Sequence, residues 1–382
     1  MNSSAQPFRR IASNLLWTPQ GLFRNPLVGV AADGRILTVD TCDEPDRSPG
    51  TEFYAGVLAP GLVNAHCHLE LSYLRGAIPE GCGFAGFASG MARVRERFSD
   101  EQRREAVSAA DAAMRQAGIE AVGDVSNGDT TFAVKSDSRI AYHTFVEFFG
   151  LRASSADPLR PLLRHPHTSL TPHSLYSVQD APLRAIAAEG DAPLSIHFLE
   201  SPGEAALFER RGPLWEWYEK AGFSCDFLHY GSAAERLVAS VPRDRRVLLV
   251  HNCCVTQRDI DIVMEHFTAP VWWCLCPRSN RYISGLEPPV GLLRRNRLAI
   301  CLGTDSLASN DRLSVFEEMR MFPGIPLPEL LSWAASGGAR ALGMDDELGT
   351  VAPGRRCGLT VISGLDYDTL CLTSASQIRR IL

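Results

Sequence analysis

Two histidines, His66 and His68, are the clearest candidates for metal binding or catalysis in this chain, and they lie at the end of an apolar run. Residues two apart on a β-strand project to the same side, so both imidazoles could bind one metal ion. Such a pair also arises by chance in a chain with ten histidines. The assignment of His66 and His68 as metal ligands therefore depends on where the predicted strands and helices place them.

Other ionisable side chains stand where further apolar runs end. Each of them alone is explained by an ordinary hydrogen bond at a strand end. Gathered at one place, they would cost stability without a metal ion or a catalytic role. Neutral imidazoles and a carboxylate suit Zn²⁺, and Fe²⁺ accepts the same set. These side chains are Glu147, His173, His197, Glu200, His251 and Asp305.

Eight apolar runs alternate with helical patterns. The runs are continuous, which is typical of parallel strands buried on both faces. They predict an α/β fold, a (β/α)8 TIM barrel, whose active sites lie at the C-terminal ends of its strands. A doubly wound open sheet is the alternative, but its Gly-rich phosphate turn is missing from the sequence. The runs span residues 57–66, 119–126, 140–150, 168–174, 193–200, 246–253, 270–277 and 298–305.

Two of the intervening helices have recognisable ends. A helix over residues 100–117 is predicted with Ser99 or Asp100 as its cap and Gly118 as its stop. The stretch Ser201-Pro202-Gly203-Glu204 has the spacing of a capping box, and Gly212 would end that helix.

Both ends of the chain fall outside this rhythm. The stretch VGVAADGRILTVD near the N-terminus and ELGTVAPGRRCGLTVIS near the C-terminus contain short strand-like pieces with Gly turns. We expect residues 1–56 and 347–382 to form one small β-sandwich-like domain, and residues 57–346 to form the barrel.

Composition excludes several classes of protein. The 382 residues are 45% hydrophobic and 21% charged, with a net charge of −6, as expected for a globular chain with a real core. The sequence has no long basic run for nucleic acid and no apolar stretch that would cross a membrane. The N-terminus lacks the apolar core of a signal peptide, and the eleven cysteines include no CxxC pair. We therefore expect a cytoplasmic protein with reduced thiols.

Several sequence blocks together resemble the amidohydrolase superfamily, in its metal-dependent deaminase branch. The blocks are PGLVNAHCHLELS, SIHFLES, LLVHNCC, CPRSN and CLGTDSLASN, and they are similar to those of aminofutalosine and methylthioadenosine/S-adenosylhomocysteine deaminases. The resemblance implies that Glu200 is the proton shuttle and that His251 orients the attacking water. Asp305 would bind the metal and also accept a proton. The metal ligands that the resemblance implies are His66, His68, His197 and Asp305.

The scarcity of lysine bears on the number of metal ions. Two-metal members of this superfamily usually place a carboxylated lysine at the end of the fourth strand, where this chain has Thr171-Pro172-His173. Lys135 and Lys220, the two lysines of the sequence, lie elsewhere along it. We therefore expect one Zn²⁺ per chain, with Fe²⁺ as the alternative.

The residues that contact the substrate are harder to predict. His173 resembles a histidine that faces the substrate in related deaminases. Glu70 could reach a ribose hydroxyl or a cationic group, or form a salt bridge with Arg75. Glu147 and Arg75 complete the candidate contacts, and Phe84 and Phe87 could stack on a flat base.

The expected function is release of ammonia from an aminopurine nucleoside or a similar amidine. A second hypothesis is hydrolysis of a cyclic amide or of a bond on an s-triazine-like ring. A third is a metal-bound, inactive binding module, which would not need Glu200 and His251. The partner is a small-molecule substrate rather than nucleic acid or membrane. The oligomeric state stays open, with a homodimer as the candidate.

Overall fold

Eight parallel strands form the barrel in this computed structural model, which describes residues 9–44, 46–47 and 49–382. They make two four-stranded sheets, and the bridges Ser174–His197 and Cys67–Asp305 close these sheets into a ring. The predicted TIM barrel is confirmed. Its strands are β6 (Leu62–Cys67), β7 (Ile119–Ser126), β8 (Ala141–Phe148), β9 (Thr168–Pro172), β10 (Leu194–Phe198), β11 (Val247–His251), β12 (Val271–Leu275) and β13 (Ala299–Leu302).

The first predicted run, 57–66, is divided between two strands of different sheets. β5 (Glu52–Ala59) ends before Pro60-Gly61, and β6 begins at Leu62. Proline has no backbone N–H to donate to a strand ladder, so the chain changes sheet at this point. The expected domain boundary at residues 56–57 lies within β5 and stays a prediction.

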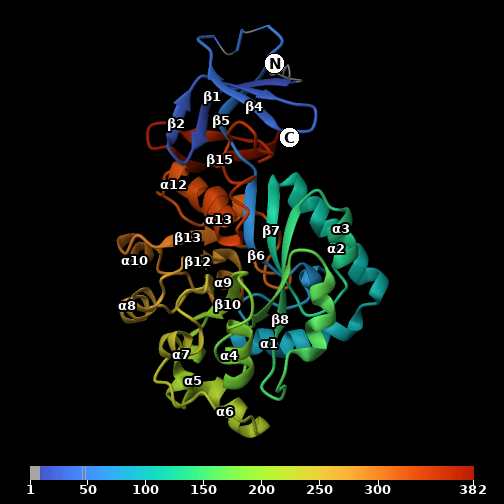
Figure 1. The fold of residues 1–382 in the computed structure, drawn as a ribbon, viewed down its shortest axis with the longest axis vertical. Helices are drawn as coiled ribbons and strands as arrows, with labels where there is room; N and C mark the ends of the chain where they lie inside the picture. The colour runs from blue at the N-terminus through green and yellow to red at the C-terminus, as the bar shows by residue number, and fades with distance from the viewer. Residues whose placement is uncertain (1–8, 45, 48) are drawn as a thin grey trace.

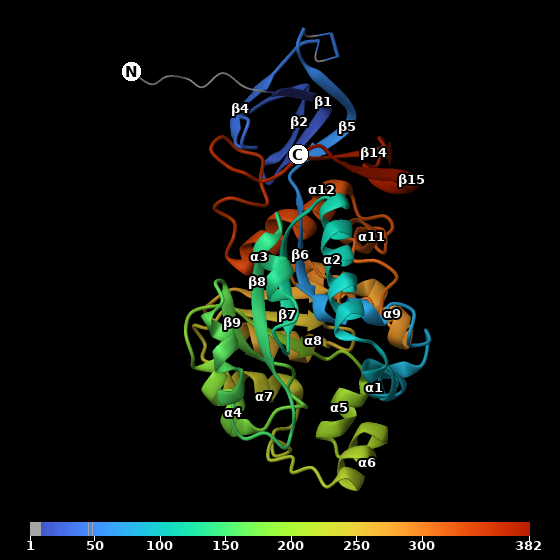
Figure 2. The same cartoon turned by 90° about the vertical axis from the view of Figure 1, so that its right-hand side faces the viewer.

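β5 belongs to a seven-stranded sheet built from both ends of the described chain, with the order β15-β14-β5-β1-β3-β4 and β2 paired to β1. In Figures 1 and 2 this sheet stands at one end of the molecule, with α12 between it and the barrel. The small terminal β-domain is thus confirmed. Its remaining strands are β1 (Arg9–Thr18), β2 (Gly21–Arg24), β3 (Pro26–Val30), β4 (Ile36–Thr41), β14 (Thr360–Asp366) and β15 (Cys371–Arg380).

Helices follow the barrel strands along the chain. The predicted capping box at Ser99 is present at the start of α2, with Gln102 as its partner. At α5 the box differs: the Ser201 side chain makes no cap hydrogen bond, and Gly212 begins α6 instead of ending a helix. The α-helices are α1 (Gly83–Val94), α2 (Asp100–Gln116), α3 (Phe132–Asp137), α4 (Asp180–Ala187), α5 (Pro202–Phe208), α6 (Gly212–Ala221), α7 (Ala233–Ser240), α8 (Gln257–His266), α9 (Pro277–Ser284), α10 (Val290–Arg295), α11 (Val315–Met319), α12 (Leu327–Leu331) and α13 (Gly338–Leu342).

Helical segments of other types connect these elements. They are 3-10 turns η1 (Leu69–Leu74), η2 (Arg95–Arg97) and η3 (Asp157–Arg164), and a π-helical turn η4 (Ser332–Gly337). Across the described residues, none of the helices is long and apolar enough to cross a bilayer. All eleven cysteines are free thiols, as expected.

Candidate metal centre

His66 and His68 lie beside Asp305 at the seam where the last barrel strand meets the first. The carbonyl oxygen of His66 accepts hydrogen bonds from the N–H groups of Thr304 at 2.9 Å and of Asp305 at 3.1 Å. The two imidazole rings are 4.9 Å apart, and His68 Nε2 lies 3.6 Å from Asp305 Oδ1. Backbone pairing across the seam therefore brings the carboxylate to the histidine pair.

His197 and His251 approach the same point from β10 and β11. His197 donates its Nδ1–H to the carbonyl oxygen of His173 at 2.9 Å, and His251 donates its Nδ1–H to Asn280 Oδ1 at 2.8 Å. A neutral imidazole whose Nδ1 is protonated carries its lone pair on Nε2. This is the arrangement in which a histidine binds a metal, with its other nitrogen held by a fixed partner.

The donor atoms of this cluster fit a metal ion. Ligand atoms of His66, His68 and Asp305 lie within 4.8 Å of one another, as do those of His66, His197 and His251. The buried Nε2 of His66 has no hydrogen-bond partner among the described residues. His68 Nε2 and His197 Nε2 are 3.3 Å apart, close to the separation of about 3.3 Å for two nitrogens bound at about 2.0–2.1 Å to a tetrahedral ion.

The charge state of the cluster points the same way. Burial lowers the pKa of His66 and of His197 well below the usual histidine value, and neighbouring imidazoles lower both further. Both rings are therefore neutral, as metal ligands must be. Asp305 is held through its other oxygen, Oδ2, which accepts hydrogen bonds from Ser279 Oγ and Ser309 Oγ.

Glu200 stands beside this cluster rather than in it. Its Oε1 lies 3.8 Å from His251 Nε2, and its side chain is 12% exposed. The Glu200 N–H donates to Glu204 Oε2 at 3.1 Å, and Glu204 is 1% exposed. The Glu204 carboxyl group thus bonds to the backbone of Glu200, the residue before the helix cap. The sequence pattern predicted that it would bond to Ser201 instead.

Strained backbone surrounds the cluster. Leu199, His251, Asn252 and Asp305 have positive φ angles of 48°, 77°, 59° and 55°. Residues other than glycine adopt this region at a cost, and such positions concentrate at functional sites. The strain here directs side chains that a regular strand would send elsewhere.

A second polar chain runs along the rim from Glu70 to His173. Asn127 donates its backbone N–H to Glu70 Oε2 at 3.0 Å and its side-chain amide to Glu147 Oε2 at 3.0 Å. His173 donates its Nδ1–H to Glu147 Oε1 at 2.7 Å. Burial raises the pKa of Glu70 to about 8, with the carboxylates of Asp124 and Glu147 adding to it. Burial also works to raise the pKa of Glu147, but His173 outweighs it and brings this pKa to about 2.

The other candidate contacts are less engaged. Arg75 is exposed, and the Glu70 carboxyl group accepts a hydrogen bond from the Asn127 backbone N–H instead. Phe84 on α1 packs edge-on against Tyr176 at 5.9 Å, and Phe87 packs into a separate apolar cluster. Phe149, which sequence reasoning missed, is 60% exposed and stands edge-on to His173 at 4.9 Å.

Sequence reasoning also missed some of the side chains that hold the site residues in place. Asn280 and Ser279 both lie in the CPRSN block at the start of α9. The sequence analysis used this block for the resemblance but predicted no role for its serine and asparagine. Asn127 follows the second barrel strand, and an inspection of every strand end would have found it. Nothing in the local sequence marks Glu204 as the partner of the Glu200 backbone.

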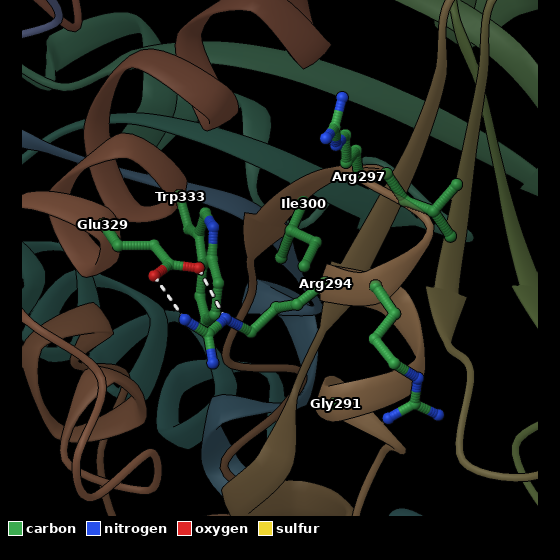
Figure 3. A pocket seen from close by; sticks show the side chains of 8 residues that line it. Gly291, Arg294, Arg297, Ile300, Glu329 and Trp333 are labelled. Carbon is green, nitrogen blue, oxygen red and sulfur yellow. Dashed lines mark hydrogen bonds and ion pairs between the residues drawn. The ribbon is translucent and has the colours of Figure 1, made fainter.

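A surface cavity of 580 Å³ lies away from this cluster, between α10, the start of β13 and α12 (Figure 3). It contains three arginines, Arg294, Arg295 and Arg297, beside Trp333. Arg294 is neutralised by Glu329 through two hydrogen bonds of 2.7 Å. None of the predicted site residues lines this cavity, so it is separate from the candidate metal centre.

The family model described as "Amidohydrolase family" matches residues 57–378. A 5-methylthioadenosine/S-adenosylhomocysteine deaminase of Teredinibacter turnerae is 26% identical over 343 residues, covering 82% of this chain and 73% of that protein.

Two solved structures share the fold. The aminofutalosine deaminase of Helicobacter pylori in complex with methylthio-coformycin has a TM-score of 0.77 at 24% identity, covering 93% of this chain and 92% of the other. An adenosine deaminase of Xanthomonas campestris with bound zinc has a TM-score of 0.71 at 23% identity, covering 95% and 87% of the two chains.

Proposed function

The chain belongs to the amidohydrolase family as a deaminase-like hydrolase acting on C–N bonds, and from this premise we propose that it releases ammonia from an aminopurine nucleoside. The observation that carries the proposal is the meeting of four imidazoles and two carboxylates, Asp305 and Glu200, at one end of the barrel. The deaminase named among its relatives, and the zinc in one similar structure, support the same assignment.

His66, His68, His197 and Asp305 would hold one Zn²⁺. Such an ion, when bound, lowers the pKa of a water molecule toward neutrality. The free Nε2 of His251 is placed to accept a hydrogen bond from that water and to orient it. Asp305 would also accept a proton from that water, while Ser279 and Ser309 hold its Oδ2.

Glu200 would protonate a ring nitrogen of the purine, regain a proton from the hydroxyl group that has added to the ring, and pass it to the departing amine. Protonation of the ring makes the neighbouring amidine carbon electrophilic. Glu200 suits this task because it is near the cluster without being a ligand, and because Glu204 fixes its backbone.

The rim favours an uncharged nucleoside over a nucleotide. Glu70, Asn127 and Glu147 present carboxyl and amide groups, which hydrogen-bond sugar hydroxyls, and the Glu147 carboxylate, whose pKa is about 2, repels phosphate. The exposed ring of Phe149 and the half-buried ring of Phe84 offer flat apolar faces for a base.

An ammonia-release screen of the zinc-loaded protein tests the proposal. The substrates are adenosine, methylthioadenosine, S-adenosylhomocysteine, aminofutalosine, guanine and cytosine, with adenosine monophosphate as the charged counterpart of adenosine. We expect turnover of an aminopurine nucleoside and much weaker turnover of the monophosphate. Release of chloride from a chloro-s-triazine without any ammonia release would contradict the proposal.

One metal ion per chain is the first prediction. The four-ligand set holds a single ion, and Lys135 is ion-paired with Asp124 instead of being available at the mouth. Elemental analysis of protein purified without added metal should give about one Zn or Fe per chain. Two ions per chain at the barrel mouth would contradict this prediction.

The His173→Ala variant should lose catalytic efficiency, measured as kcat/KM, while keeping its metal. His173 Nδ1–H is held by Glu147, so its Nε2 is free for the substrate, and the backbone carbonyl that orients His197 survives the substitution. Loss of one hydrogen bond costs about 0.5–1.5 kcal/mol, so kcat/KM should fall about 2- to 13-fold. His143→Ala, at a histidine bonded to Ser169 instead, is the control and should leave kcat/KM unchanged. Loss of metal in His173→Ala would show that its role is structural.

A further inference from the structure

Lys135, one of the two lysines of this chain, is buried. It lies in the last turn of α3, and its side chain is 6% exposed. Its ammonium group forms an ion pair with Oδ2 of Asp124 on β7. It also donates to Thr144 Oγ1 at 2.9 Å and to Ser126 Oγ at 3.3 Å. The three donors of the ammonium group are therefore all used inside the protein.

The other oxygen of Asp124 holds the backbone that carries the histidine pair. Asp124 is fully buried, and its Oδ1 accepts the N–H of Leu69, the residue after His68, at 2.8 Å. In the β6–β7 register Asp124 is also opposite Cys67, the residue before His68. One carboxylate thus joins Lys135 on one side to the end of the His66–His68 strand on the other.

We propose that the Lys135–Asp124 ion pair positions the backbone around His68 and so sets the direction from which this imidazole binds the metal. A buried ion pair is a poor source of stability, because desolvation of the two charges offsets their attraction. Its presence directly behind a predicted ligand is explained if it specifies one geometry. The inference rests on the proposed metal centre and goes beyond it, because neither residue binds the metal or touches substrate.

Asp124→Asn is the informative substitution. Asparagine keeps the size of the side chain but only one acceptor oxygen. Lys135 stays charged in this variant, so its ammonium group still needs an acceptor. The single amide oxygen must then turn to the ammonium group, because the amide nitrogen cannot accept a hydrogen bond from it. Leu69 N–H loses its partner as a result. In the double variant Asp124→Asn/Lys135→Met the ammonium group is gone, so the amide oxygen is free to return to Leu69.

Two measurements follow this hydrogen bond. We expect Asp124→Asn to weaken zinc affinity about 10- to 100-fold, the usual effect of removing a group that orients a ligand. The double variant should recover to within a few-fold of the unsubstituted protein. Zinc affinity is measured by competition with a chromophoric chelator. Hydrogen exchange at the Leu69 amide, measured in metal-free protein, should accelerate in Asp124→Asn and slow again in the double variant.

Glu120→Gln is the matched control, because Glu120 is a buried carboxylate at the opposite end of β7, paired with Arg115 and Arg380. It should leave zinc affinity and Leu69 exchange unchanged. Unchanged affinity and exchange in Asp124→Asn would overturn the inference, and so would a double variant no better than the single one. If the unsubstituted protein bound no zinc, the proposed function would fail, and exchange at Leu69 alone would decide the role of the ion pair.

Discussion

The Glu200→Gln variant is expected to keep its metal and its stability while kcat falls at least about 10²-fold, the lower end of a general acid–base contribution. Glutamine preserves the shape of the side chain but has no proton to give to a ring nitrogen and no basic oxygen to regain one. The N–H of residue 200 still donates to Glu204, so the turn that carries the side chain should persist.

Metal content by elemental analysis, thermal unfolding and steady-state rates on the same preparation check this expectation. Glu209→Gln is the control, since Glu209 is an exposed carboxylate that pairs with Arg211 at the end of α5, the helix that follows Glu200. Its loss should change neither metal content, nor thermal unfolding, nor rate. If Glu200→Gln emptied the site, Glu200 would be a ligand. If activity survived within a few-fold, the proton would travel through another group, with Glu147 the first to test.

The barrel and the strand-end positions of its ionisable residues could be predicted because both are encoded locally, whereas the full ligand set rests on the resemblance to a family. A continuous apolar run indicates a buried parallel strand, and the residue that ends such a run must lie at the rim. The spacing of His66 and His68 also fixes that both rings can face one point. These predictions needed no knowledge of which strands are neighbours.

Some of the groups that hold the site residues could not be predicted in the same way, because they reach those residues across a long stretch of chain. Asn280 bonds to His251, 29 residues away, and Ser279 bonds to Asp305, 26 residues away. Only closure of the barrel brings them together. The positive φ angles at His251 and Asp305 also break the alternation of a regular strand, so the direction of these side chains is a tertiary property.

The capping pattern at α5 shows how a local rule is overridden at the site. Ser201 and Glu204 have the right spacing for a reciprocal box, but the Glu204 carboxyl group bonds to the N–H of Glu200 and leaves the serine cap unused. Burial raises the pKa of Glu204 well above its usual range. Position and burial of this carboxyl group, which a sequence pattern does not contain, make it a support for Glu200.

Loss of the metal itself is expected from Asp305→Asn, with affinity lower by more than about 100-fold, beyond the effect of removing an outer partner. The amide removes the one negative charge among the four proposed ligands. Ser279 and Ser309 both donate to Oδ2, so they hold an acceptor oxygen there. If the amide oxygen takes that position, the atom 3.6 Å from His68 Nε2 becomes an NH₂ group, which cannot bind a cation.

Chelator competition measures this loss directly, without any substrate. Asp311→Asn is the matched control, since Asp311 lies six residues later and pairs with Arg278 on the surface; it should bind zinc normally. Ser309→Ala removes only one of the two donors to Oδ2 and should fall between these variants, at about 10-fold. An Asp305→Asn protein that binds zinc as tightly as the unsubstituted chain would mean that the metal is held by histidines alone, with His251 taking the place of the carboxylate.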